Sequence, residues 1–222
     1  MPKVRFRISI SLDGYVAGPN QSTKDPLGVG GENLHEWVVS LAAWRAEHGK
    51  TGGEVNESTQ VVEEALANIG ATIMGRNMFG GHPGPWSSST PWKGWWGDHP
   101  PFHHPVFVLT HYAREPLVMK GGTTFNFVTD GIESALEQAR RAAGSKDIAL
   151  AGGAQAAQEY LRAGLVDEMV LSQVPILLGS GERLFENVGT DMHGLELLHT
   201  VDAPGVTHLK FVRRSERAAT SA

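Results

Sequence analysis

The sequence predicts an α/β protein with a mainly parallel central sheet, helices on both faces of that sheet and an antiparallel hairpin at the C-terminal end. Short apolar runs alternate with helical patterns across residues 57–173, as they do in strand–helix–strand units. One of these runs ends at Gly152-Gly153 and is followed at once by a helical pattern. Two further apolar stretches, 193–201 and 205–213, flank a Pro-Gly turn, which indicates the hairpin.

The composition is that of a globular protein. The chain has 222 residues, of which 41% are hydrophobic and 19% charged, enough to bury a sizeable core. Its net charge of −5 disfavours nucleic-acid binding, and the lack of cysteine excludes disulfides, thiolate nucleophiles and cysteine–zinc sites. We find neither a membrane-spanning apolar run nor the apolar core of a signal peptide. We therefore expect a cytoplasmic protein with a small-molecule ligand and no nucleic-acid or membrane partner.

The N-terminal third predicts a strand, a loop and two helices. Apolar and polar residues alternate over 4–12, which predicts a strand with one apolar face, and Asp13-Gly14 then makes a tight turn. The strand resumes briefly at Tyr15–Ala17 before a glycine-rich loop at 18–31. Apolar spacing predicts two helices beyond the loop, the second capped by Asn56 or Ser58: 33–47 and 57–68.

The rest of the chain predicts alternating strands and helices. Apolar runs predict buried strands at 71–74, 106–109, 124–128, 148–150 and 166–173. Helical patterns predict helices at 132–143 and 154–163. We expect one domain over 1–214, with a Trp-, His- and Pro-rich loop inserted at 77–105 and a frayed tail at 215–222.

Three predicted strand ends carry residues suited to an anionic ligand: Gly75-Arg76-Asn77, Thr110–Arg114 and Ala151–Gln155. The carboxyl ends of parallel strands meet at one edge of an open sheet, and ligands bind there. Glycine lets the backbone approach a ligand, the following helix directs N–H groups at an anion, and arginine pairs with phosphate through two parallel bonds. Any one of these three strand ends could form only a turn, but three such ends in one sheet indicate a phosphorylated ligand.

The Rossmann dinucleotide fingerprint is absent. Gly28-Val29-Gly30-Gly31 follows no strand directly. Gly152-Gly153 lacks both the third glycine and the acidic residue that the fingerprint needs about 20 positions further on. A dinucleotide would therefore bind by another scheme.

Six motifs occur in order along nearly the whole chain: Ser11–Ala17, Met74–Arg76, Val108–Thr110, Ala151–Gly153, Leu161–Glu168 and Val174–Phe185. Together they resemble the dihydrofolate-reductase-like superfamily, in the branch of the reductase domain of bacterial riboflavin biosynthesis (the RibD C-terminal domain family). The resemblance implies a three-layer sandwich, a homodimer, NADPH as the cofactor and hydride transfer to a pterin- or pyrimidine-like substrate. The activity would be of the 5-amino-6-(5-phosphoribosylamino)uracil reductase type.

The resemblance also implies which residues bind NADPH. Val16 and Ala17 would border the nicotinamide, and Gly75 and Arg76 would meet the phosphates. Thr110, His111 and Arg114 would flank the adenosine with its 2′-phosphate. The pyrophosphate would lie at the turn formed by Ala151, Gly152, Gly153, Ala154 and Gln155. A cis peptide bond is implied between Gly152 and Gly153.

A proton donor is harder to assign. Relatives carry an acidic residue on the first helix, where this chain offers Glu36, and Asp13 lies within a matched motif. Glu36 fits a solvated carboxylate equally well, and Asp13 fits a residue that fixes the Asp-Gly turn. The cofactor supplies the hydride in such reductases, so a missing acid weakens the substrate assignment more than the reaction class.

The 77–105 insert contains four of the six tryptophans and a histidine cluster. Prolines within it prevent the regular helix that would align His99 with His103, so we expect no metal. A loop this long is usually functional. We expect it to cover the pocket, with Trp95 and Trp96 as aromatic walls for a flat substrate, or to pack against a second subunit. The alternative is a small satellite core.

Other functions stay open at this point. A nucleotide-binding module without catalytic activity fits if Glu36 donates no proton. A metal-dependent hydrolase would need a metal ion at 99–104. A flavin could also take the place of the nicotinamide.

Overall fold

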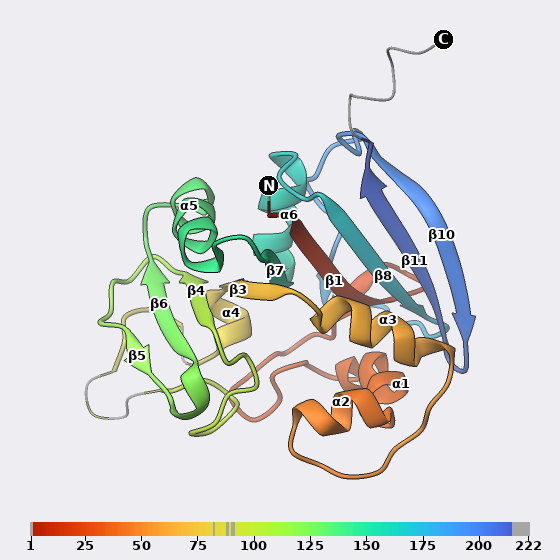
Figure 1. Cartoon of the computed structure of the whole chain (residues 1–222), viewed down its shortest axis with the longest axis horizontal. Helices are drawn as coiled ribbons and strands as arrows, with labels where there is room; N and C mark the ends of the chain where they lie inside the picture. The colour runs from red at the N-terminus through yellow and green to blue at the C-terminus, as the bar shows by residue number, and fades with distance from the viewer. Residues whose placement is uncertain (1, 82, 88, 90–91, 215–222) are drawn as a thin grey trace.

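The computed structural model describes residues 2–81, 83–87, 89 and 92–214, and its main element is a nine-stranded sheet (Figure 1). The tail predicted at 215–222 lies outside the described residues. The spatial order of the strands is β10 (Leu195–Ala203), β11 (Val206–Arg213), β8 (Glu168–Val174), β1 (Val4–Ser11), β7 (Asp147–Gly152), β3 (Ile69–Gly75), β4 (Pro105–Leu109), β6 (Thr124–Val128) and β5 (Leu117–Val118). The six strands from β8 to β6 in this order run parallel, and β10, β11 and β5 pair antiparallel with their neighbours.

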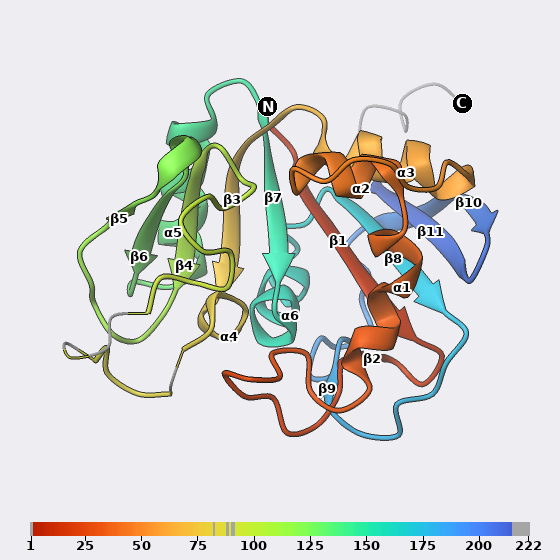
Figure 2. The same cartoon turned by 90° about the horizontal axis from the view of Figure 1, so that it is seen from below.

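Helices cover both faces of this sheet, which is the middle of three layers (Figures 1 and 2). One face carries α5 (Ile132–Ala143) and α6 (Ala154–Arg162), and the other carries η1 (Gly31–His35), α1 (Glu36–Val39), α2 (Ala42–Glu47) and α3 (Glu57–Leu66). The main core lies between the sheet and α5 and α6, where Phe6, Leu150 and Tyr160 are buried. The predicted fold class, including the C-terminal hairpin, is confirmed. No helix of the described ranges is long and apolar enough to cross a membrane.

The single helix predicted over 33–47 was wrong, because the chain breaks at Leu41. Leu41 has φ −70° and ψ 138°, an extended conformation, and separates α1 from α2. The backbone there pairs with the glycine-rich segment that follows: Ala42 N–H donates to the Glu54 carbonyl at 2.8 Å, and Glu54 N–H donates to the Ser40 carbonyl at 2.8 Å. Burial of the Leu41 side chain at this bridge outweighs the helical pattern.

Tyr15–Ala17 forms β2, which does not continue β1. It pairs with β9 (Glu182–Arg183) in a separate two-stranded sheet at the carboxyl edge of the main sheet (Figure 2). Gly181 makes this pairing possible: its φ is +129°, and a Cβ there would lie 2.1 Å from the Ala17 carbonyl oxygen. The sequence showed neither β9 nor the two-residue β5, because such short strands carry no periodic signal.

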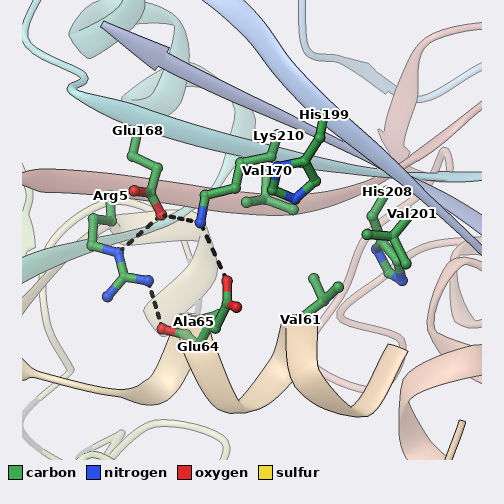
Figure 3. Close-up of a pocket in the computed structure, with 10 residues that line it drawn as sticks. All are labelled: Arg5, Val61, Glu64, Ala65, Glu168, Val170, His199, Val201, His208 and Lys210. Carbon is green, nitrogen blue, oxygen red and sulfur yellow. Dashed lines mark hydrogen bonds and ion pairs between the residues drawn. The ribbon is translucent and has the colours of Figure 1, made fainter. Parts of the chain in front are cut away.

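Charged side chains fasten α3 to the sheet (Figure 3). Arg5 of β1 donates to the carbonyl oxygens of Glu64 and Ala67, at 2.5 and 2.9 Å, and its Nε lies 3.3 Å from Glu168 Oε1. Lys210 Nζ lies 3.2 Å from Glu64 Oε2 and 3.5 Å from Glu168 Oε1. The cavity beside this cluster measures about 20 Å³, room for one water at most. The cluster is therefore structural.

Candidate functional site

The turns that follow β3 and β7 touch each other at the carboxyl edge of the sheet (Figure 2). Met74 of β3 pairs with Gly152 of β7. A Cβ placed on the next residue, Gly75, would lie 3.3 Å from the Cβ of Ala156 and 3.5 Å from the backbone nitrogen of Gly153. Two predicted ligand-binding turns thus form a single corner, which we call the glycine corner (Gly75, Gly152 and Gly153).

Two helices begin at the glycine corner. α4 (Arg76–Phe79) has Gly75 as its N-cap and α6 has Gly153, and among the described residues neither cap supplies a side-chain hydrogen bond. A Cβ on Gly153 would meet nothing within 4 Å, so open space lies in front of α6. The Gly152–Gly153 peptide bond is cis, which confirms the expectation. Uncapped helical N–H groups facing open space are suited to an anion.

Two arginines stand beside the glycine corner. Arg76 opens α4, and Arg114 follows the turn after β4, whose last residue Leu109 pairs with Gly75. Both guanidinium groups lie over the ring of Trp86, with Cζ at 3.4 Å from the centroid for Arg76 and 4.9 Å for Arg114. Burial and the charge of Arg114 lower the pKa of Arg76, and burial lowers the pKa of Arg114. An anion would relieve both effects.

The other residues expected at the cofactor differ in how far they are buried. Thr110 is buried, where its N–H donates to the Val128 carbonyl at 3.0 Å, while His111 and Gln155 are exposed. Val16 and Ala17 are buried in β2 at the same edge of the sheet (Figure 2). The structure therefore groups the residues of the β3 and β7 turns, places Arg114 beside them, and leaves His111 in solvent.

A cleft of about 780 Å³ opens on the α1–α2 face of the sheet and extends to Ala151, the residue before the glycine corner. β1, β7 and β3 form its floor, and its walls include α1 and α2 on one side and Trp96 with residues 101–104 on the other. Ala151 and Met78 line it, and Met78 Sδ would lie 3.9 Å from a Cβ on Gly152. A ligand held by its phosphates at the corner can therefore extend into the cleft.

A buried arginine lies in the floor of the cleft. Nη1 of Arg7 is buried and has no hydrogen-bond partner among the described residues. Burial, with the charge of Arg5, lowers the pKa of Arg7. Burial also lowers the pKa of His35, which lines the same cleft, and the charge of Arg7 adds to this effect. An unmade bond at a buried donor is costly, so the Arg7 guanidinium group destabilises the fold at this position.

Neither candidate acid lines the cleft. Glu36 is exposed on α1. Asp13 accepts hydrogen bonds from Ser11 Oγ at 2.6 Å and from the N–H groups of Leu178 and Gly179 at 3.2 and 2.7 Å. These bonds, that of Ser11 above all, lower the pKa of Asp13 to about 2. Asp13 therefore stays ionised and ties the β1–β2 turn to residues 178–179.

Only some tryptophans of the insert lie where the sequence predicts, at the wall of the cleft. Trp96 lines the cleft, whereas Trp95 packs on Gly80 and donates from Nε1 to the Met78 carbonyl at 3.0 Å. Trp86, Trp92 and Trp96 pack against a second apolar cluster around Phe79 and Phe125, so the insert does form a satellite core. Within the described ranges, no three His, Asp or Glu side chains are arranged to hold a metal ion.

Sequence reasoning missed the cleft residues Arg7, Ser9, His35 and Trp37. The signal was present, because Arg5, Arg7 and Ser9 alternate along one face of β1. A central parallel strand has both faces covered, so an arginine there must be buried. Trp37 is held by its Nε1, which donates to Ser9 Oγ at 3.1 Å.

Comparison with known proteins shows the family. The family model described as the RibD C-terminal domain matches residues 2–209. No curated protein matches the chain.

Solved structures show the same fold. A protein of Shewanella sp. PV-4 assigned to riboflavin biosynthesis is 22% identical with a TM-score of 0.60, covering 97% of this chain and 100% of that one. RibD of Acinetobacter baumannii is 18% identical with a TM-score of 0.56, covering 97% of this chain and 59% of that protein. The deaminase/5-amino-6-(5-phosphoribosylamino)uracil reductase of Thermotoga maritima is 13% identical with a TM-score of 0.56, covering 96% of this chain and 57% of that protein. The chain thus spans little more than half of the two longer proteins.

Proposed function

The chain belongs to the RibD C-terminal domain family, and from this membership and the geometry of the site we propose that it is an NADPH-dependent reductase of a small heterocyclic substrate. One observation carries the proposal: the glycine corner, suited to phosphate, adjoins at Ala151 a cleft whose floor holds Arg7. The reductase activity in the name of the Thermotoga maritima protein supports a pyrimidine-like substrate, and the cleft of about 780 Å³ has room for a pterin-like one.

The residues present fit the phosphates of a dinucleotide. The open space at Gly153 and the uncapped N-terminus of α6 would hold the pyrophosphate. Arg76 and Arg114 would pair with the remaining phosphate charge, including a 2′-phosphate. Val16 and Ala17 would border the nicotinamide. When bound, NADPH supplies the hydride.

The side chains of the cleft would position the substrate. Trp37, Trp96 and Phe102 offer aromatic surface for a planar ring. The guanidinium group of Arg7, which lines the cleft, would donate to a carbonyl or ring-nitrogen acceptor of the substrate and draw electron density from the reacting bond. Because Glu36 and Asp13 lie outside the cleft, we propose that water in the open cleft delivers the proton.

A second candidate function is a non-catalytic NADPH-binding module. The placement of Glu36 and Asp13 outside the cleft favours it. Calorimetric titration of the full chain with NADPH, NADH and FMN, followed by NADPH oxidation across a panel of pterins and aminopyrimidines, separates the two. Turnover with any member supports the reductase, whereas tight NADPH binding without turnover supports the module. FMN binding in place of NADPH contradicts both.

The partner and the compartment remain proposals. We propose a homodimer that works in the cytoplasm, as expected from the resemblance and from the lack of cysteine. The outermost strand β10 exposes Leu197 and Leu198 at 51% and 58%, which supports a contact between chains. Sedimentation of the protein and of Leu197→Asp tests the dimer.

A further inference from the structure

Trp86 links the two arginines of the glycine corner to the inserted loop. The Arg76 Cζ lies 3.4 Å and the Arg114 Cζ 4.9 Å from the centroid of its ring, both within the range of a cation–π contact. Two neighbouring guanidinium groups repel each other, and partial burial strengthens the repulsion. The negative face of an aromatic ring offsets this cost, so Trp86 stabilises the two cations beside each other.

Trp86 is itself firmly held. Its Nε1 donates to the Tyr112 carbonyl at 2.7 Å, in the turn after β4. Its ring packs edge-on against Phe79 and Phe127, with centroids 5.8 and 5.0 Å apart. These partners belong to α4, to the turn after β4, and to β6. The indole therefore spans the carboxyl ends of three neighbouring strands and is fixed in register with them.

A second tryptophan of the same loop fixes Arg114. The Nη1 group of Arg114 donates to the Trp92 carbonyl at 2.6 Å, and the Cζ of Arg114 lies 5.2 Å from the ring of Phe127. A guanidinium group carries its N–H donors along its edges, in its own plane. These N–H edges of the guanidinium group are the ones that pair with phosphate oxygens.

We propose that Trp86 is a positioning residue, whose ring preorganises Arg76 and Arg114 to bind the phosphates of the cofactor. This inference rests on the proposed function, and it gives the 77–105 insert a role beyond that of a wall for the substrate. Preorganised cations bind an anion more tightly because fewer side-chain rotamers are lost on binding. The role depends on the π face of the ring and not on apolar bulk alone.

The test is a calorimetric titration of the full chain with NADPH and with NADH. Trp86→Leu keeps apolar packing and removes the π face, whereas Trp86→Phe keeps a π face. Trp95→Ala disturbs the same loop at Trp92 and Met78 and leaves the indole of Trp86 in place. We expect Trp86→Leu to weaken NADPH binding about tenfold and NADH binding about threefold, so that the preference for NADPH falls. Trp86→Phe and Trp95→Ala should keep that preference within about twofold.

Several outcomes overturn the proposal. An unchanged NADPH/NADH ratio in Trp86→Leu, or an equal fall in Trp95→Ala, means that Trp86 only supports the loop. Tighter NADPH binding by Trp86→Leu means that the indole occupies the site of the cofactor. If Trp86→Leu melts below the assay temperature, Trp86→Met takes its place.

Failure of the proposed function gives a different pattern. Parent protein that binds neither NADPH nor NADH refutes the reductase, and inorganic pyrophosphate then serves as the probe. Weaker pyrophosphate binding by Trp86→Leu than by the parent supports the positioning role. Equal binding, or none by the parent, refutes it.

Discussion

Gly75 and Ala156 face each other at the glycine corner: a Cβ on Gly75 would lie 3.3 Å from the Cβ of Ala156. Gly75 has φ −78°, which any residue can adopt, so the space beside Ala156, and not the backbone conformation, limits the side chain at this position. Gly153 shows the opposite arrangement, with nothing within 4 Å of its would-be Cβ. The corner is thus tightly packed between its two turns and open in front of α6, where the ligand is proposed to lie.

Gly153→Ala should separate ligand binding from stability. Its φ of −68° suits alanine, so we expect the free energy of unfolding to change by less than about 1 kcal/mol. The added methyl would fill the space proposed for phosphate, so NADPH should bind at least about tenfold more weakly. Urea unfolding and calorimetry measure the two effects. Gly152→Ala is the control: its φ of +112° should destabilise the fold by more than about 1 kcal/mol. Unchanged NADPH affinity in Gly153→Ala would contradict the placement.

Arg114→Ala should narrow the preference for NADPH over NADH. A 2′-phosphate is the only difference between the two cofactors, and a guanidinium group pairs with it through charge-assisted hydrogen bonds worth about 1.5–3 kcal/mol. We therefore expect NADPH affinity to fall about tenfold or more while NADH affinity changes little. Competition between the two cofactors in one titration measures the ratio. Equal affinities in the parent protein would refute the assignment.

Arg7→Met should raise stability and lower activity. The buried Arg7 Nη1 has no hydrogen-bond partner in the described structure, so replacing it with an apolar chain should stabilise the fold by about 1 kcal/mol or more. Loss of the donor should reduce kcat/KM about tenfold or more without changing NADPH affinity. Arg5→Met is the matched control: Arg5 is ion-paired, so its loss should destabilise the fold. Undiminished kcat/KM in Arg7→Met would remove Arg7 from substrate binding.

Glu168→Ala should destabilise the protein strongly. The Glu168 side chain is 10% exposed and lies between Arg5 and Lys210, at 3.3 and 3.5 Å. Its removal takes away the carboxylate that Arg5 and Lys210 share with Lys3 in a partly buried site, which costs about 3 kcal/mol. Chemical denaturation measures the change. Simultaneous replacement of Arg5 and Lys210 by Met should recover part of the loss, and no recovery would show that the ion pairs are not its source.

Stability should fall below neutral pH partly through His208. Its ring nitrogens lie 2.9 Å from Ser58 Oγ and Ser172 Oγ in a buried site, and burial, with the charge of Arg7, lowers its pKa to about 4. The unfolded chain takes up this proton near pH 6.5 and the folded chain only near pH 4. The stabilisation is therefore complete above pH 6.5 and is lost as the pH falls to 4, by up to about 3 kcal/mol. His208→Gln should flatten the pH dependence in this window, and an unchanged slope would refute the assignment.

The sequence predicted the parallel core of the fold well because its elements are strongly periodic. β6 and α5 span the predicted residues 124–128 and 132–143, and Asn56 caps α3 as one of the two proposed residues. The helix over 33–47 failed because the buried pairing of Leu41 with a later loop is a tertiary effect that spacing cannot show.

The site was predictable only in part. Glycine turns and arginines at strand ends are visible in the sequence, and the cis bond at Gly152 followed from a family resemblance. The cleft residues were not predicted because Arg7 and His35 lie on different elements, and only packing of α1 over β1 brings them to one cavity. The stacking of Trp86 between distant arginines depends on the path of the insert, which has no periodic pattern to predict it.

The position of β7 has a consequence for how the protein is made. β7 lies between β1 and β3, yet it is translated long after both: the Lys3 N–H bonds to Asp147, 144 residues later. A chain leaving the ribosome therefore cannot close the middle of its sheet until about two thirds of it has emerged. Until then the facing edges of β1 and β3 have no partner and can pair wrongly with other chains. We expect the nascent protein to need a chaperone that shields extended segments during this interval.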